Sequence, residues 1–170
     1  MRQMNVPLEE ELTIEPMQLS DIDAVHEIEK RSFYCPWSKE TFTGEIMSNS
    51  FASYWVMRKD KDIIGYGGMW LILDEAHITT LALLPEFRQR GLGSMLIEFL
   101  IEASRERGVA RLTLEVRTSN QPAVTLYKKH GFVITGMRPQ YYKDEDAYIM
   151  WKDDLLDEKP KEQGDHNTGN

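Results

Sequence analysis

The hydrophobic positions of this chain follow the period of strands in some segments and the period of helices in others. Residues 51–58, 62–73 and 76–84 are rich in aromatic and β-branched side chains and are separated by short polar turns. Such segments predict three consecutive strands joined as a meander. Residues 111–117 alternate strictly between apolar and polar side chains, and similar patterns predict further strands at 12–17, 132–135 and 147–151.

Four other segments carry apolar side chains at helical spacing. Ser20 is expected to open the first helix with Asp23 at the capping-box position, and Ser38 is expected to cap a short second helix after the break at Pro36. Residues 94–107 and 119–131 predict two longer helices, each followed or closed by a glycine. The resulting order predicts one α/β domain, with a mixed, mostly antiparallel sheet flanked by helices.

Composition narrows the class of protein. The 170 residues include one cysteine, so neither an intrachain disulfide nor a cysteine-rich metal site is expected. The longest apolar runs fall far short of the ~20 residues of a membrane helix, and the first residues lack the apolar region of a secretory signal. The four histidines lack metal-ligand spacing, so no metal is expected. These features together predict a cytoplasmic protein without a membrane partner.

The formal net charge is −8, which argues against a general nucleic-acid binder and suits a basic partner. Acidic side chains are concentrated after residue 152, where apolar residues are scarce, and this end is expected to be a disordered tail. The predicted organisation is therefore an N-terminal extension at 1–11, a folded domain at 12–152 and an acidic tail at 153–170.

A glycine loop between a predicted strand and a predicted helix carries the sharpest chemical signal. It reads R-Q-R-G-L-G, from Arg88 to Gly93. Glycines let a backbone approach a ligand closely, and the positive end of the following helix favours an anion such as phosphate. A P-loop is excluded because the chain has no Gly-Lys pair, and a dinucleotide fingerprint would need a small residue where Leu96 stands. A tight turn with two solvated arginines is the alternative.

The R-x-x-G-x-G pattern, in this order of elements, resembles the pyrophosphate loop of the GNAT acyltransferases, which bind acetyl-coenzyme A. The resemblance spans about residues 12 to 152. The segment L-E-V-R-T-S-N-Q-P-A-V-T-L-Y-K-K-H-G-F resembles the bacterial ribosomal-protein-alanine N-acetyltransferases, as do P-W-S at 36–38 and the Tyr141-Tyr142 pair. The chain departs from that pattern at Cys35 and in its longer acidic tail.

The resemblance implies roles for individual residues. Glu115 would accept the proton of the amine and Tyr127 would donate one to the leaving thiolate. The strand at 81–83 would lie along the pantetheine arm, and Asn120 would contact the cofactor. The residues implied to bind the cofactor are Leu81, Ala82, Leu83, Arg88, Gln89, Arg90, Gly91, Leu92, Gly93, Ser94 and Asn120.

Each of these residues also has a purely structural interpretation. Glu115 can be a surface residue of a half-exposed strand, and Tyr127 can pack in the core. His77 and Cys35 are expected to be packing residues. Phe33, Trp37, Tyr141 and Tyr142 can line an acceptor groove or simply pack.

The chemistry favours an α-amine as acceptor, because its pKa of about 8 lies well below the ~10.4 of a lysine side chain. The expected function is transfer of an acetyl group from acetyl-coenzyme A to a protein N-terminus. By resemblance, this is the N-terminal alanine of a basic small-subunit ribosomal protein. The alternatives are the same fold acting on lysine side chains or small-molecule amines, and a non-catalytic module that binds coenzyme A.

Overall fold

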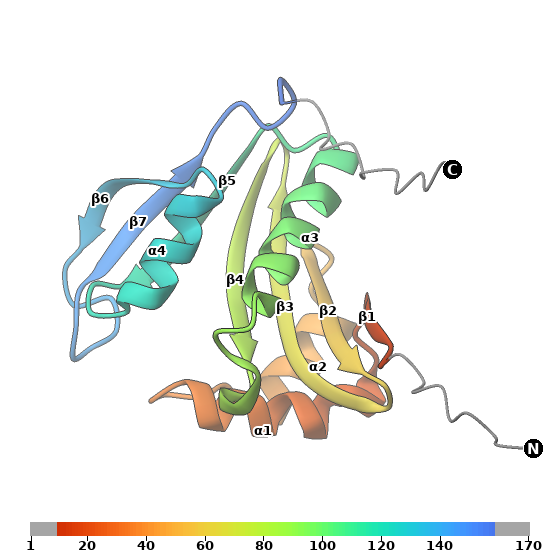
Figure 1. The fold of residues 1–170 in the computed structure, drawn as a ribbon. Coiled ribbons are helices and arrows are strands. Elements are labelled where there is room, and N and C mark those ends of the chain that lie inside the picture. The colour runs from red at the N-terminus through yellow and green to blue at the C-terminus, as the bar shows by residue number, and fades with distance from the viewer. Residues whose placement is uncertain (1–9, 159–170) are drawn as a thin grey trace, which may run out of the picture.

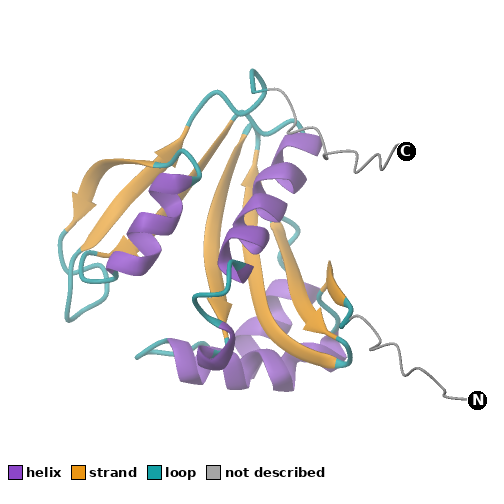
Figure 2. Ribbon diagram, viewed as in Figure 1, coloured by secondary structure: helices purple, strands orange, loops and turns teal. Residues whose placement is uncertain are grey.

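The computed structural model describes residues 10–158, which form a single sheet with helices on both faces (Figures 1 and 2). The sheet has seven strands in the order β1-β2-β3-β4-β5-β7-β6. The strands are β1 (Leu12–Pro16), β2 (Ala52–Lys59), β3 (Asp62–Ile72), β4 (Glu75–Leu83), β5 (Arg111–Arg117), β6 (Val133–Arg138) and β7 (Ala147–Lys152). The helices are α1 (Ile22–Ser32), α2 (Lys39–Met47), α3 (Leu92–Glu106) and α4 (Gln121–Lys129). The predicted fold class is confirmed.

One pair of neighbouring strands in this sheet is parallel. The chain crosses from β4 to β5 through α3, and the parallel pairing covers Glu75–His77 against Arg111–Thr113. Beyond this short contact β4 continues beside β3, whereas β5 continues beside β7. The two halves of the sheet therefore diverge, and Figure 1 shows β4 and β5 splaying apart below their point of contact.

Apolar side chains on the two faces of the sheet pack against different helices. On one face, Leu100 of α3 and Val124 of α4 join a core with Leu112 and Leu114 of β5. On the other face, residues of α1 and α2 pack against β2 and β3 in a second core. Because side chains alternate along a strand, Glu115 points away from the α3–α4 core, towards the face that α1 and α2 cover farther along the sheet.

The first helix begins differently from the prediction. A 3₁₀ turn at Leu19–Asp21 precedes α1, and the Asp21 carboxylate accepts a hydrogen bond of 2.8 Å from the backbone N–H of Gln18. Asp21 therefore provides the cap that was expected of Asp23, and Asp23 instead forms an exposed ion pair with Lys39. The predicted cap of the second helix is confirmed, since the Ser38 hydroxyl accepts from the Thr41 N–H at 3.1 Å.

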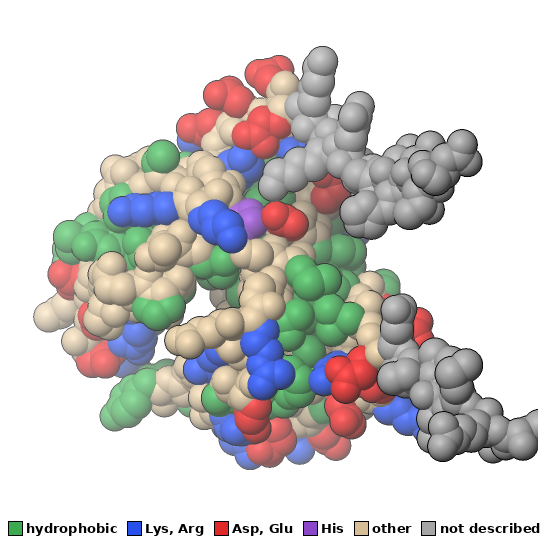
Figure 3. All heavy atoms as spheres, in the orientation of Figure 1, with side chains coloured by type: hydrophobic (Ala, Val, Ile, Leu, Met, Phe, Trp, Pro, Cys, Tyr) green, Lys and Arg blue, Asp and Glu red, His purple; other side chains and the backbone are tan. Residues whose placement is uncertain are grey.

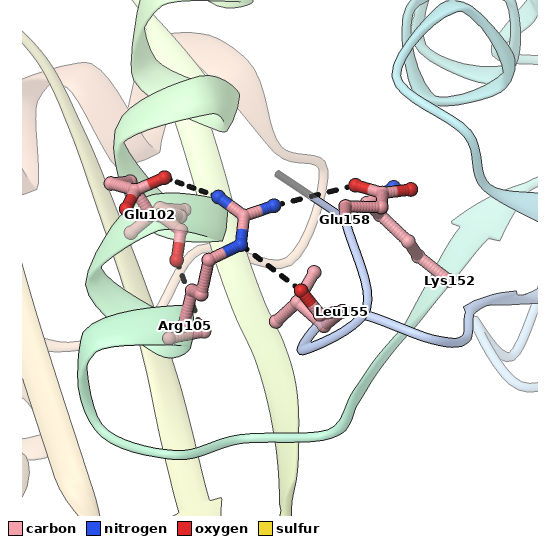
Figure 4. Close-up of polar contacts among 7 residues, drawn as sticks. Glu102, Arg105, Lys152, Leu155 and Glu158 are labelled. Carbon is pink, nitrogen blue, oxygen red and sulfur yellow. Dashed lines mark hydrogen bonds and ion pairs between the residues drawn. The ribbon is translucent and has the colours of Figure 1, made fainter. Parts of the chain in front are cut away.

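The first residues of the predicted acidic tail pack on the domain (Figure 4). Leu155 is fully buried, and its carbonyl accepts a hydrogen bond of 3.0 Å from Nε of Arg105 in α3. Glu158 pairs with the buried Lys152 at 2.7 Å and with Arg105 at 3.3 Å. Residues 153–158, the first part of the predicted tail, thus contact α3 and β7. Residues 159–170 of the predicted tail, and 1–9 of the predicted extension, lie outside the described residues.

Candidate active site

The site is built around the gap that opens where β4 and β5 part. His77 belongs to the last paired row of the two strands, opposite Thr113, and Glu115 follows on β5 just beyond it. In the space-filling view the two halves of the molecule are separated by an open notch, with Lys and Arg side chains above and below it (Figure 3). The gap therefore exposes backbone edges of β4 and β5 that a continuous sheet would hide.

Glu115 holds a buried carboxylate at the edge of this gap. Its side chain is 8% exposed, and its Oε2 lies 2.5 Å from Nε2 of His77. Its Oε1 lies 3.5 Å from Nε of Arg138, on β6. The surface position considered for Glu115 is therefore wrong, because two basic side chains hold the carboxylate in a largely buried place.

The environment of Glu115 keeps its carboxylate ionised. Burial acts to raise its pKa, but the hydrogen bond and charge of His77, with the charge of Arg138, outweigh burial and leave the pKa below its ordinary value. An ionised carboxylate has no proton to donate and can accept one, so at neutral pH Glu115 can serve as a base.

The position of His77 was not expected from the sequence. Its side chain is 29% exposed and contacts Glu115, so the expectation of a core histidine is wrong. A signal was available in the alternation of this strand, where Glu75, His77 and Thr79 share one face and Ala76 and Ile78 share the other. Polar residues at alternating positions predict a side chain that points away from the core.

Tyr127 approaches from the opposite face of the sheet. It lies on α4, its ring packs against Phe132 at 5.8 Å, and it belongs to the α3–α4 core. Burial raises the pKa of its hydroxyl to about 12. Glu115 and Tyr127 thus flank β5 from its two faces, an arrangement that suits a base on one side of a reacting group and an acid on the other.

The glycine loop has the geometry of an anion site. Gly91 adopts φ of +80°, caps α3 without a side-chain hydrogen bond, and has no atom within 4 Å of where a Cβ would stand. Its positive φ therefore favours glycine, and the space where a Cβ would stand is open. The N–H groups of the first turn of α3 meet no capping side chain from Gly91, which leaves them available to an oxygen-rich ligand.

The β4 edge that faces the gap also carries backbone donors. The N–H of Leu84 bonds to the carbonyl of Ile64 on β3 at 2.8 Å. Because successive N–H groups of a strand point to opposite sides, those of Leu83 and Leu81 point towards the gap. An extended ligand with amide groups can pair with this edge as an additional strand would.

Comparison with known proteins identifies the family. Residues 22–132 match the acetyltransferase (GNAT) family. The chain belongs to this family.

Three similar proteins carry the name of one activity within that family. The chain is 38% identical over 144 residues to the ribosomal protein bS18-alanine N-acetyltransferase of Salmonella typhimurium, covering 81% of this chain and 95% of the relative. A Bacillus subtilis protein that carries the same name provisionally is 47% identical over 137 residues, covering 79% of this chain and 91% of the relative. The crystal structure of the ribosomal-protein-S18-alanine N-acetyltransferase of Escherichia coli superposes with a TM-score of 0.78 at 32% identity, over 91% of this chain and 99% of that one.

The GNAT fold also occurs in complexes with coenzyme A. One example is the PaiA N-acetyltransferase of Thermoplasma acidophilum, whose TM-score is 0.75 at 21% identity, over 84% of this chain and 99% of that one. At this identity the likeness concerns the fold alone.

The polar side chains of the GNAT glycine loop are mostly engaged with the protein itself. Arg88 donates from Nε to the carbonyl of Leu83 at 3.1 Å and from Nη2 to the Ser32 hydroxyl at 3.1 Å. Arg90 lies over the ring of Phe87, 5.5 Å from its centroid. In this arrangement Arg88 fixes the loop between β4 and α1, and the backbone supplies the donors that face the gap.

Two further residues implied to bind the cofactor have structural partners as well. The Ser94 hydroxyl lies 3.1 Å from Nε2 of His130. Oδ1 of Asn120 accepts from the N–H of Ala123 at 3.3 Å and so caps α4. This cap lies at the start of the helix that carries Tyr127, and asparagine is among the residues preferred at such a position.

Two segments border the Glu115 side of the gap. On one side, Tyr142 donates from its hydroxyl to the carbonyl of Glu115 at 3.2 Å and lies against Tyr141, with 4.9 Å between ring centroids. On the other side, Phe33 and Cys35 are exposed, whereas Trp37 packs against Phe42 at 5.4 Å. The expectation that Cys35 is a packing residue is therefore wrong, and Trp37 packs in the α1–α2 core.

Residues 10–158 contain no group of three or more His, Cys, Asp or Glu side chains arranged to hold a metal ion. Within the same residues no helix is long and apolar enough to cross a bilayer.

Proposed function

We propose that this GNAT chain transfers an acetyl group from acetyl-coenzyme A to the α-amine of a protein N-terminus. The observation that carries the proposal is the buried, ionised carboxylate of Glu115, held by His77 at the point where β4 and β5 part. Coenzyme A would lie in the gap, with its pyrophosphate on the loop Arg88–Ser94 and its amide-bearing arm along Leu81–Leu83.

Glu115 prepares the acceptor for attack. An amine attacks a thioester only in its neutral form, and an α-amine with a pKa near ~8 needs only modest help to lose a proton at neutral pH. Glu115 takes this proton directly or through one water. The 2.5 Å contact with Nε2 of His77 fixes the position of Oε2 of Glu115.

The backbone of β4 stabilises the charge that develops during attack. As the amine nitrogen bonds to the thioester carbon, negative charge gathers on the carbonyl oxygen. The N–H of Leu83 points into the gap and can donate to this oxygen without rearrangement, while the N–H of Leu81 remains available to the amide-bearing arm. Preorganised donors of this kind are often the largest single contribution to catalysis.

Tyr127 supplies a proton to the leaving sulfur from the face of β5 opposite Glu115. When the carbon–sulfur bond breaks, its electron pair goes to sulfur, and the resulting thiolate takes a proton from the Tyr127 hydroxyl. The proton removed from the amine balances the one gained by sulfur: Glu115 releases its proton to solvent and Tyr127 regains one from solvent before the next turnover. Because burial raises the pKa of Tyr127 to about 12, the transfer is favourable only to a thiolate that is itself desolvated.

The acceptor we propose is the N-terminal alanine of a small-subunit ribosomal protein. The names of the relatives at 38% and 47% identity support this choice. The formal charge of −8 also suits a basic acceptor, which would be met in the cytoplasm, and argues against direct binding of nucleic acid.

Mapping of the product tests the proposal. The protein is incubated with acetyl-coenzyme A and a basic peptide that begins with alanine and contains internal lysines, and fragments are sequenced by mass spectrometry. A matched peptide with a blocked α-amine is the control. Acetylation of the α-amine in the first peptide and none in the second supports the proposal. Acetyl-lysine in both peptides contradicts it and favours the side-chain alternative.

A further inference from the structure

A β-bulge lies on β4 between His77 and the donors that face the gap. The register of β3 and β4 shifts between Gly68 and Met69, so that Met69 pairs with Ile78 and Gly68 pairs with Thr80. Thr79 is the extra residue. A bulge redirects the strand and its side chains, so its geometry determines where the N–H groups of Leu81 and Leu83 point.

Both threonines of this bulge are hydrogen-bonded to buried tyrosines. The Thr80 hydroxyl donates to the hydroxyl of Tyr66 at 3.3 Å, and the Thr79 hydroxyl lies 3.1 Å from the hydroxyl of Tyr54. Tyr66 is fully buried on β3, and Tyr54 is nearly so on β2. The bulge is thus held from two strands at two successive residues.

Each tyrosine is in turn bonded to a helix carboxylate. Tyr54 donates to Oε2 of Glu45 on α2 at 2.9 Å, and Tyr66 donates to Oε2 of Glu29 on α1. A phenol has one hydrogen, so a tyrosine that donates to a carboxylate must accept from its threonine. Two chains of the form Thr→Tyr→Glu therefore run from the bulge to α1 and α2.

The carboxylates at the ends of these chains are themselves fixed. Glu29 accepts from the backbone N–H of Trp37 at 2.9 Å, and Glu45 accepts from Nε1 of Trp70 at 2.6 Å. Trp37 lies in the segment between α1 and α2 that borders the gap. Each chain thus connects the bulge to a carboxylate of α1 or α2 that accepts a second hydrogen bond.

We propose that Tyr54 and Tyr66 are positioning residues, which hold the β4 bulge so that the N–H of Leu83 faces the reacting carbonyl and the N–H of Leu81 faces the gap. The inference rests on the proposed function. Both tyrosines are buried, and each acts through a threonine. An alternative is that the two hydroxyls merely satisfy buried polar groups, in which case they affect stability and not rate.

Removing single hydroxyls separates these two roles. Tyr54→Phe and Tyr66→Phe keep the rings, and each should lower kcat about tenfold, with a larger loss in the double variant, because small misplacements of catalytic groups cost rate. The Kd of coenzyme A, measured by calorimetry, should rise by a smaller factor than kcat falls, since only its arm lies along Leu81–Leu83 and its pyrophosphate lies on the loop Arg88–Ser94. Thr80→Val removes the same hydrogen bond from the other end, with little change of shape, and should reproduce the effect of Tyr66→Phe.

A control variant accounts for lost stability. Glu158→Ala leaves the buried Lys152 without this ion pair, far from the bulge, and should lower the Tm while kcat stays at the wild-type value. If the tyrosine variants lower the Tm in the same way and keep wild-type kcat on the same peptide, the inference is overturned.

A second measurement does not depend on acetylation. Amide hydrogen exchange at residues 79–83 should be faster in the double tyrosine variant than in the wild type or in Glu158→Ala. Unchanged exchange would overturn the inference even if no peptide is acetylated. A wild-type protein that acetylates no N-terminus would contradict only the proposed function.

Discussion

The carboxylate of Glu115 and the imidazole of His77 lie 2.5 Å apart on the two strands where the parallel pairing of the sheet ends. His77 is in the last paired row and Glu115 is just beyond it, so the pair marks the opening of the gap. A base at this place meets an acceptor that approaches from the α1–α2 side of the sheet, while the α3 side retains the glycine loop.

His77 should control the pH range in which Glu115 works. In His77→Ala the main partner is lost and burial acts with less opposition, so the pKa of Glu115 should rise. Glu115 accepts a proton only when ionised, so activity is lost as the pH falls through its pKa. The acid limb of kcat/KM should therefore move to higher pH. Arg138→Ala, which removes a more distant and exposed charge, should give a smaller shift in the same direction. An acid limb that stays in place in His77→Ala contradicts the coupling of the pair.

Gly91 should be required for the cofactor and not for the fold. Gly91→Val places a side chain where the pyrophosphate would lie, so the Kd of acetyl-coenzyme A should rise by at least about a hundredfold, roughly 3 kcal/mol. Gly108→Val is a matched control, because Gly108 has φ of +74° and equally open surroundings at the other end of α3. Both variants should lose similar stability through backbone strain. Equal cofactor affinity in the two variants, measured by calorimetry, would place the phosphate site elsewhere.

Tyr127→Phe should separate an acid from a packing residue. The ring remains against Phe132, so the Tm should change little. If the hydroxyl protonates the thiolate, kcat should fall about 10²–10⁴-fold, with coenzyme A affinity unchanged. Stopped-flow measurement of a single turnover on a peptide reads this step directly. A wild-type rate would mean that the thiolate leaves without this proton.

Glu29 should make the stability of the domain depend on pH. Burial raises its pKa from 4.5 to about 7, against the opposing hydrogen bond from the backbone of Trp37. With the folded pKa above the unfolded one, the folded state holds an extra proton between these values, so this contribution to stability is present at low pH and is lost as the pH rises towards 7. The loss amounts to at most about 3 kcal/mol.

The Glu29→Gln variant cannot ionise, so urea unfolding of wild type and variant should converge near pH 5 and diverge towards pH 7.5, with the variant the more stable at the higher pH. Parallel pH profiles of the two proteins would show that Glu29 does not titrate in this range.

Most of the fold could be predicted from the sequence because the patterns that indicate its strands, turns and caps are local. Alternating strands, the glycine loop and the Ser38 cap each depend on a few neighbouring residues, and all appear in the structure. The family resemblance added the assignment of Glu115 and Tyr127, which periodicity alone left open between a functional and a structural role.

The missed features depend on contacts between distant segments. The partnership of His77 with Glu115 follows from the register of β4 against β5, which joins residues 38 positions apart. Leu155 is buried where Arg105 bonds to its carbonyl and Lys152 pairs with Glu158, which holds residues 153–158 against α3 and β7. The composition of this segment shows that it is acidic and does not indicate these contacts. The two threonines of the β4 bulge likewise form hydrogen bonds with tyrosines from other strands.

The central claim is that Glu115 removes the proton of an α-amine, and the pH profile of Glu115→Gln tests it most directly. The amide keeps the shape of the side chain and cannot act as a base. With an alanine-initiated peptide, kcat/KM of the variant should be about 10²–10³-fold below wild type at pH 7, and this deficit should shrink above pH 9, where the amine is already neutral. A deficit of the same size at every pH would contradict the claim and would assign Glu115 to positioning of the acceptor.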